Sequence, residues 1–233
     1  TEEHHHPRLH RRTAPPVPQR SRAILFDLDN CLCDARAVGN SLFAPAFQAI
    51  AAANQGHVPQ ASLEVAFGEC WHTSFDLVAQ RHGFSPAMVR AGLEVFRRLQ
   101  VSGPLRGYPD LAVLPTLPVQ RHLVTSGFQR LQASKVRALG IAGCFSSVRI
   151  DAVDVPPHRG KQGIFVDILR EHGFAPGEVL VVGDNPLSEL QAGRTLGMPT
   201  VQTLRPGVAP ADADFHVDHL DQLFAILDGR APG

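Results

Sequence analysis

The stretch that decides the fold is Ala23-Ile-Leu-Phe-Asp-Leu-Asp-Asn30. Its first four residues are apolar, and this run predicts a short strand buried in a parallel sheet. Two acids and a turn former follow where that strand ends. Ligands of open α/β sheets bind outside the carboxyl ends of the strands, so Asp27 and Asp29 are candidate site residues. Side chains two positions apart on an extended chain can point the same way, which lets one acid attack while the other handles protons.

Beyond residue 103 the chain alternates between strands and helices. Apolar runs predict strands over residues 121–125, 145–150, 179–182 and 199–203, and a short one over 214–217. Helices are expected between and after them, over residues 128–139, 161–172, 186–196 and 218–227. This alternation predicts an α/β fold with a Rossmann-like, doubly wound parallel sheet covered on both faces.

Residues 36–103, by contrast, show helical patterns only. Apolar residues at helical spacing predict helices over residues 41–55, 61–82 and 85–100. Three helices inserted after the first strand predict a small all-helical cap. The chain is therefore divided into a tail (1–21), an α/β core (22–35 and 104–233) and a cap (36–103).

Composition excludes several classes of partner. The 22 Lys and Arg residues balance the 22 Asp and Glu residues, so there is no global field to attract nucleic acid. The apolar runs are too short for a membrane span.

The Arg- and Pro-rich tail has no apolar stretch typical of a secretory signal, and a disordered tail is preferred over an Arg-rich transit segment. The four cysteines lack zinc-site spacing, which favours a reduced, cytoplasmic chain.

Further polar side chains stand at the predicted strand ends or in adjoining loops. Thr125 ends one strand, Asp184 follows another with Glu189 close behind, and Lys161 opens a helix. Parallel strands present their carboxyl ends at one edge, so the fold should gather these residues with Asp27 and Asp29.

Four segments together resemble the motifs of the haloacid dehalogenase superfamily. These are, in chain order, Phe26-Asp-Leu-Asp-Asn-Cys-Leu32, Leu123-Val-Thr-Ser-Gly127, Lys161 at a helix start, and Val181-Val-Gly-Asp-Asn-Pro-Leu-Ser-Glu189. Each alone is a weak signal, but all four stand at the expected boundaries and span the core. The chain thus resembles the phosphatase branch of the superfamily with a helical, C1-type cap.

The resemblance implies a reaction that passes through a covalent intermediate. Asp27 would attack the phosphorus atom and become an aspartyl-phosphate. Asp29 would protonate the leaving oxygen and then accept a proton from the hydrolytic water. Mg²⁺ would be held by the Asp27 carboxylate, the main-chain carbonyl of Asp29 and Asp184, an all-oxygen set that suits this ion.

The resemblance also implies the groups that bind phosphate. Thr125, with Ser126, would bind phosphoryl oxygens, and Lys161 would neutralise the charge of the phosphate and the nucleophile. Glu189 would orient Lys161 or a metal-bound water, with Asn185 in a supporting place.

The third motif departs most from the family pattern, because Gln162 follows Lys161 where Pro is frequent. Arg159 is the reserve candidate for the cation. Lys161 is nevertheless one of only two lysines, the other being Lys135, beside twenty arginines. The compact ammonium of lysine and the planar guanidinium of arginine contact a crowded phosphate differently, which gives a physical reason to keep lysine there.

The expected function is Mg²⁺-dependent hydrolysis of a small phosphorylated metabolite. One alternative is a phosphomutase of the same superfamily, if the cap excludes water. Another is a non-catalytic binding or regulatory protein that keeps the fold. The resemblance disfavours a haloacid dehalogenase, because that reaction does not need an acid at the position of Asp29. It also disfavours a phosphonate hydrolase, which needs a cap lysine to form a Schiff base, because residues 36–103 contain no lysine.

Overall fold

The computed structural model describes residues 20–233, so almost all of the predicted tail (1–21) lies outside the described residues. Its core is a six-stranded sheet in the order β3-β2-β1-β4-β5-β6, and every neighbouring pair is parallel. The strands are β1 (Ala23–Phe26), β2 (Gln120–Gly127), β3 (Ser147–Ala152), β4 (Val179–Gly183), β5 (Thr200–Thr203) and β6 (Phe215–Val217). This confirms the predicted α/β class and places β1 near the middle, where its carboxyl end borders those of β2 and β4.

Alternating side chains of β1 supply both faces of the sheet, as expected for a strand buried on both sides. Ile24 and Phe26 belong to the cluster that packs under α5 (Gln129–Leu139) and α8 (Leu223–Leu227). Ala23 and Leu25 belong to the cluster under α6 (Gly160–His172) and α7 (Glu189–Thr195). None of the helices described between residues 20 and 233 is both long and apolar enough to cross a membrane.

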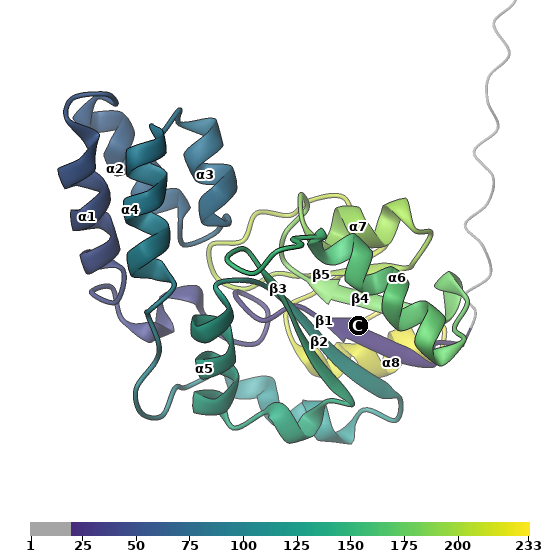
Figure 1. Ribbon diagram of the computed structural model, residues 1–233. Coiled ribbons are helices and arrows are strands. Elements are labelled where there is room, and N and C mark those ends of the chain that lie inside the picture. Colours follow the sequence, from purple (N-terminus) through teal and green to yellow (C-terminus); the bar gives the residue numbers. More distant parts are fainter. Residues whose placement is uncertain (1–19) are drawn as a thin grey trace, which may run out of the picture.

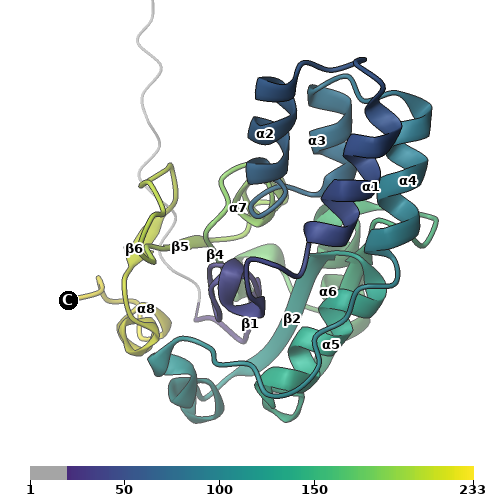
Figure 2. The ribbon, with the colours of Figure 1, turned by 90° about the vertical axis from the view of Figure 1, so that its left-hand side faces the viewer.

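The inserted helices stand beside the sheet and have a hydrophobic cluster of their own (Figures 1 and 2). They are α1 (Ala44–Asn54), α2 (Gln60–Glu69), α3 (Phe75–Arg81) and α4 (Pro86–Phe96). Their cluster is rich in aromatic rings and extends to Phe128 and Leu131 at the start of α5. The inserted helices therefore rest on the segment that leads from β2 into α5.

The prediction of a single helix over residues 61–82 was wrong, because the structure has two helices there, separated between Glu69 and Phe75. Ser74 has extended backbone angles (φ −60°, ψ 145°) that no α-helix accommodates. The break lets the Trp71 ring stack on Phe43 at a centroid distance of 4.1 Å. The apolar stripe that suggested one helix comes from two helices packed on the same core, and the loop between them faces the sheet.

Short 3₁₀ turns complete the chain. They are η1 (Ala35–Val38), η2 (Pro109–Thr116), η3 (Ala142–Cys144), η4 (Pro176–Glu178) and η5 (Leu220–Gln222). The predicted C-terminal helix over residues 218–227 is thus shorter than expected and begins as a 3₁₀ turn.

Candidate active site

The carboxyl edge of the sheet faces the inserted helices across a cavity of about 570 Å³. Asp27 follows β1 and Asp184 follows β4, while Ser126 lies near the end of β2. Lys161 comes from the first turn of α6, and Glu189 is the first residue of α7. Four segments that are far apart in sequence therefore contribute polar groups to one cavity, as the strand order requires, and Asp184 and Glu189 share one of these segments.

Lys161 contacts two of the carboxylates in this group, those of Asp27 and Glu189. Its Nζ lies 2.7 Å from Asp27 Oδ1 and 2.9 Å from Glu189 Oε2. All three side chains are almost fully buried. Burial lowers the pKa of Lys161, but the Asp27 and Glu189 carboxylates outweigh burial and the net shift is upward. Lys161 is therefore a fixed positive charge beside Asp27.

Glu189 holds its position through both carboxylate oxygens. Oε2 accepts from Lys161, and Oε1 accepts from the main-chain N–H of Asn185 at 2.7 Å. The side chain lies against Gly183, where an added Cβ would stand 2.2 Å from Oε1. Glycine at the end of β4 thus leaves the space that Glu189 occupies, and Glu189 in turn shapes the loop that carries Asp184.

Negative charge exceeds positive charge at the centre of the site. Carboxylate oxygens of Asp27, Asp184 and Glu189 lie within 4.8 Å of one another. Burial raises the pKa of Asp184, and so do the neighbouring carboxylates of Asp27 and Glu189. Burial and Glu189 likewise raise the pKa of Asp27, against the opposing effect of Lys161. Three carboxylates beside one ammonium leave an excess of negative charge, which a divalent cation with a preference for oxygen ligands would neutralise.

Asp29 is held on both of its carboxylate oxygens. Lys135 Nζ lies 2.9 Å from Oδ1, and Gln132 Nε2 donates to Oδ2 at 3.0 Å. The same amide nitrogen lies 2.7 Å from Thr125 Oγ1. Thr125 is buried and is absent from the residues that line the cavity, so its hydroxyl lies one layer deeper than the resemblance suggests.

A second polar chain runs along the neighbouring strand ends. Asp151, at the carboxyl end of β3, accepts a hydrogen bond from Ser126 Oγ at 2.9 Å. Its other oxygen accepts from the Gly160 main-chain N–H at 3.1 Å and lies 2.8 Å from His158 Nδ1. Asp151 therefore ties the end of β2 to the loop that introduces Lys161.

The inserted helices form the opposite wall of the cavity. This wall combines the aromatic residues Phe43, Trp71, Phe75 and Phe96, with Phe128 from the core, and the polar residues His72, Thr73, Ser74 and Arg81. The loop between α2 and α3 reaches the core, where Asn185 Nδ2 donates to the His72 carbonyl at 3.4 Å. A molecule in the cavity would place one end among the charged groups of the sheet edge and the other against this mixed aromatic and polar wall.

A buried ion pair fastens the loop that follows Asp29. The Arg205 guanidinium forms two hydrogen bonds with the Asp110 carboxylate, at 2.8 and 3.0 Å. It also donates to the Cys31 carbonyl through Nε and Nη2, at 3.0 and 2.7 Å. Both charged side chains are almost fully buried. The pair thus anchors the turn at Cys31, directly after Asp27 and Asp29.

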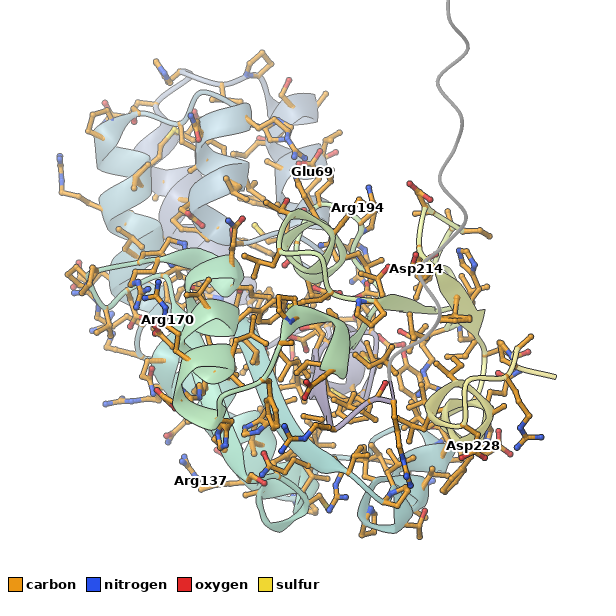
Figure 3. All side chains as sticks on the ribbon, turned by 90° about the vertical axis from the view of Figure 1, so that its right-hand side faces the viewer. Glu69, Arg137, Arg170, Arg194, Asp214 and Asp228 are labelled. Carbon is orange, nitrogen blue, oxygen red and sulfur yellow. The ribbon has the colours of Figure 1, made fainter. Side chains whose placement is uncertain are left out.

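Replacing Arg205→Leu is expected to lower the free energy of unfolding by about 3–5 kcal/mol, because it leaves the Asp110 carboxylate buried without its partner. Urea denaturation followed by circular dichroism measures this change. The control is Arg194→Leu, since Arg194 pairs with Asp212 at the surface (Figure 3) and should cost about 1 kcal/mol or less. Equal losses in the two variants would contradict the anchoring role.

The structure brings most of the predicted residues together around one cavity. Its lining includes Asp27, Asp29, Ser126, Lys161, Asp184, Asn185 and Glu189. Arg159, the reserve candidate, instead pairs with Asp167 on the exposed side of α6 at 2.8 Å. Sequence reasoning missed Lys135, Gln132 and Asp151. Lys135 had a visible signal, since it is the only other lysine, and Asp151 stands one residue beyond a predicted strand end.

Comparison with known proteins gives matches over most of the chain. Residues 21–197 match the haloacid dehalogenase-like hydrolase family. A glyceraldehyde 3-phosphate phosphatase from Methanopyrus kandleri is 26% identical over 229 residues, covering 88% of this chain and 97% of the relative. A phosphoserine phosphatase from Thermus thermophilus is 32% identical over 149 residues, covering 61% and 59%. The crystal structure of a phosphatase from Thermococcus onnurineus superposes with a TM-score of 0.61 at 22% identity, covering 90% of this chain and 99% of that one.

Proposed function

The chain belongs to the haloacid dehalogenase-like hydrolase family, and its relatives of known activity identify it as a phosphatase. We propose that it hydrolyses a small phosphomonoester through an aspartyl-phosphate on Asp27. The observation that carries the proposal is the contact of Lys161 with both Asp27 and Glu189 inside a cluster of three carboxylates. An ammonium fixed there compensates the charge of a nucleophilic carboxylate and of an arriving phosphate.

In the first half of the reaction, an Asp27 carboxylate oxygen attacks phosphorus while the bond from phosphorus to the ester oxygen breaks. The departing oxygen takes a proton from Asp29, which lines the same cavity. In the second half, Asp29 accepts a proton from water as that water attacks phosphorus. The bond between phosphorus and Asp27 then breaks, which releases inorganic phosphate and restores both carboxyl groups.

The other polar side chains position the phosphate. Lys161 would contact a phosphoryl oxygen while keeping its bond to Asp27, and Glu189 holds the ammonium in line. Ser126 lines the cavity and would donate to a second oxygen, with Thr125 beneath it. Asn185 supports Glu189 from its main-chain N–H.

The donor set fits Mg²⁺, which prefers oxygen ligands and often takes only one or two protein carboxylates. Asp27 and Asp184 would hold it with the main-chain carbonyl of Asp29, whereas both Glu189 oxygens already have partners. When bound, Mg²⁺ would withdraw charge from the phosphoryl oxygens and so favour attack by a carboxylate.

Removal of divalent ions with a chelator is expected to abolish phosphate release, and added Mg²⁺ should restore it. Asp184→Asn should raise the Mg²⁺ concentration for half-maximal rate by about tenfold or more, because a ligand loses its charge. Asp212→Asn, at a surface position, is the control. A rate that is unchanged in the chelator-treated protein would contradict the assignment.

The broad test is release of inorganic phosphate from 4-nitrophenyl phosphate and from a panel of small phosphorylated metabolites. The aromatic residues of the far wall favour esters whose alcohol half carries apolar surface, and these should be turned over with the highest kcat/KM. A bisphosphorylated sugar in the same panel separates the phosphomutase alternative, since transfer to a second hydroxyl releases no inorganic phosphate. Absence of turnover with every ester would favour the non-catalytic alternative.

A further inference from the structure

The two lysines of this chain serve the two motif aspartates, one each. Lys161 contacts Asp27, and Lys135 contacts Asp29 at 2.9 Å. Lys135 lies on α5, and its side chain is only 4% exposed. A buried lysine on a core helix is costly unless it is paired, and a leucine or methionine would pack there at lower cost. Packing of the helix alone therefore gives no reason for an ammonium at this position.

Gln132 repeats the pattern one helical turn earlier. Positions three apart on a helix lie on the same face, so Gln132 and Lys135 approach Asp29 together. Gln132 donates to Asp29 Oδ2, and Lys135 binds Oδ1, so each carboxylate oxygen has one donor. Each oxygen retains a further lone pair for the substrate side.

The backbone makes room for this arrangement. A Cβ added to Gly127 would stand 2.9 Å from both Cγ and Cδ of Gln132, so only glycine lets the amide cross the end of β2. Gly127 also has a φ of 151°, which side chains rarely adopt. The end of β2 is thus shaped around a side chain whose amide reaches Asp29.

We propose that Lys135 and Gln132 are positioning residues that aim the Asp29 carboxyl at the leaving oxygen of the substrate. The inference rests on the proposed function, because it concerns the proton transfer that Asp29 performs there. Proton transfer requires hydrogen-bond distance to the ester oxygen, and a carboxyl free to rotate would meet that condition less often. The clamp fixes the carboxyl through two donors on one rigid helix.

The test compares two aryl esters of nearly the same shape, phenyl phosphate and 4-nitrophenyl phosphate. Phenolate is the more basic leaving group, so its departure depends more on a proton from Asp29. Lys135→Met should lower kcat/KM on phenyl phosphate at least about tenfold more than kcat/KM on 4-nitrophenyl phosphate. The ratio kcat/KM reports the step that expels the alcohol, and it excludes hydrolysis of the aspartyl-phosphate, which both esters share. Gln132→Met should show the same selectivity to a smaller degree. Arg137→Met, on the exposed side of the same helix (Figure 3), should change neither rate.

A second readout separates aiming from mere packing. In an Asp29→Asn background, Lys135→Met should cause no further loss of kcat, because the group that it aims is already gone. Equal losses on both esters, or losses that multiply in the double variant, would overturn the inference while leaving the proposed function intact. Gln132→Met carries the same test if Lys135→Met does not fold. A wild-type protein that hydrolyses neither ester, or an Asp27→Asn variant that keeps full activity, would overturn both.

Discussion

Asp27→Asn is expected to lower kcat on 4-nitrophenyl phosphate by about 10⁴-fold or more, because the amide cannot form the covalent intermediate. The exchange keeps the size of the side chain. It also removes a negative charge from a cluster in which three carboxylates face one ammonium, so the fold should lose no stability. Phosphate release under saturating ester measures the rate, and thermal unfolding measures stability.

The matched control is Asp228→Asn, since Asp228 is exposed on the side of the core away from the inserted helices (Figure 3) and pairs with Arg230 at the surface. Its kcat should remain within about twofold of wild type, as is usual for surface changes. Comparable rates for wild type and Asp27→Asn would remove Asp27 from the nucleophile position.

Lys161→Met should lower kcat by about 10³-fold, since it deletes the positive charge that lies 2.7 Å from the attacking carboxylate. The variant also leaves Asp27 and Glu189 facing each other without the ammonium between them. Like charges in a buried site disfavour ionisation, so fewer Asp27 side chains would be in the attacking form. Steady-state kinetics at saturating Mg²⁺ measure the loss.

Arg159→Met is the comparison that decides which cation serves the site. Arg159 lies two residues away in sequence but pairs with Asp167 on the exposed side of α6. Its removal should leave kcat within about twofold of wild type. A larger loss in Arg159→Met than in Lys161→Met would reverse the assignment of the third motif.

The sequence predicted the core because its signals are local and consistent. The apolar run at residues 23–26 is β1 to the residue, and the acids after it mark the carboxyl edge. The predicted α/β fold and the class of enzyme, a phosphatase of this superfamily, are confirmed by the family match and the phosphatase relatives. The division into core and cap and the individual roles of the site residues stay predictions.

The features that were missed depend on long-range packing. The break at residues 70–74 accompanies the stacking of Trp71 on Phe43, a contact that helical periodicity does not encode. Lys135 lies 106 residues from Asp29, and although it is one of only two lysines, the sequence does not show which carboxylate it contacts. Arg205 and Asp110 are likewise 95 residues apart. Motifs reveal groups at strand ends, but not the second set of side chains that holds those groups in place.

The most direct measurement is peptide mass spectrometry after acid quenching of the enzyme during turnover of 4-nitrophenyl phosphate with Mg²⁺. A phosphoryl group on the peptide that contains Asp27, located at Asp27 by fragmentation and absent in Asp27→Asn, is the predicted result. A phosphoryl group on another side chain, or no phosphoenzyme at any time within the first turnover, would contradict covalent catalysis by Asp27.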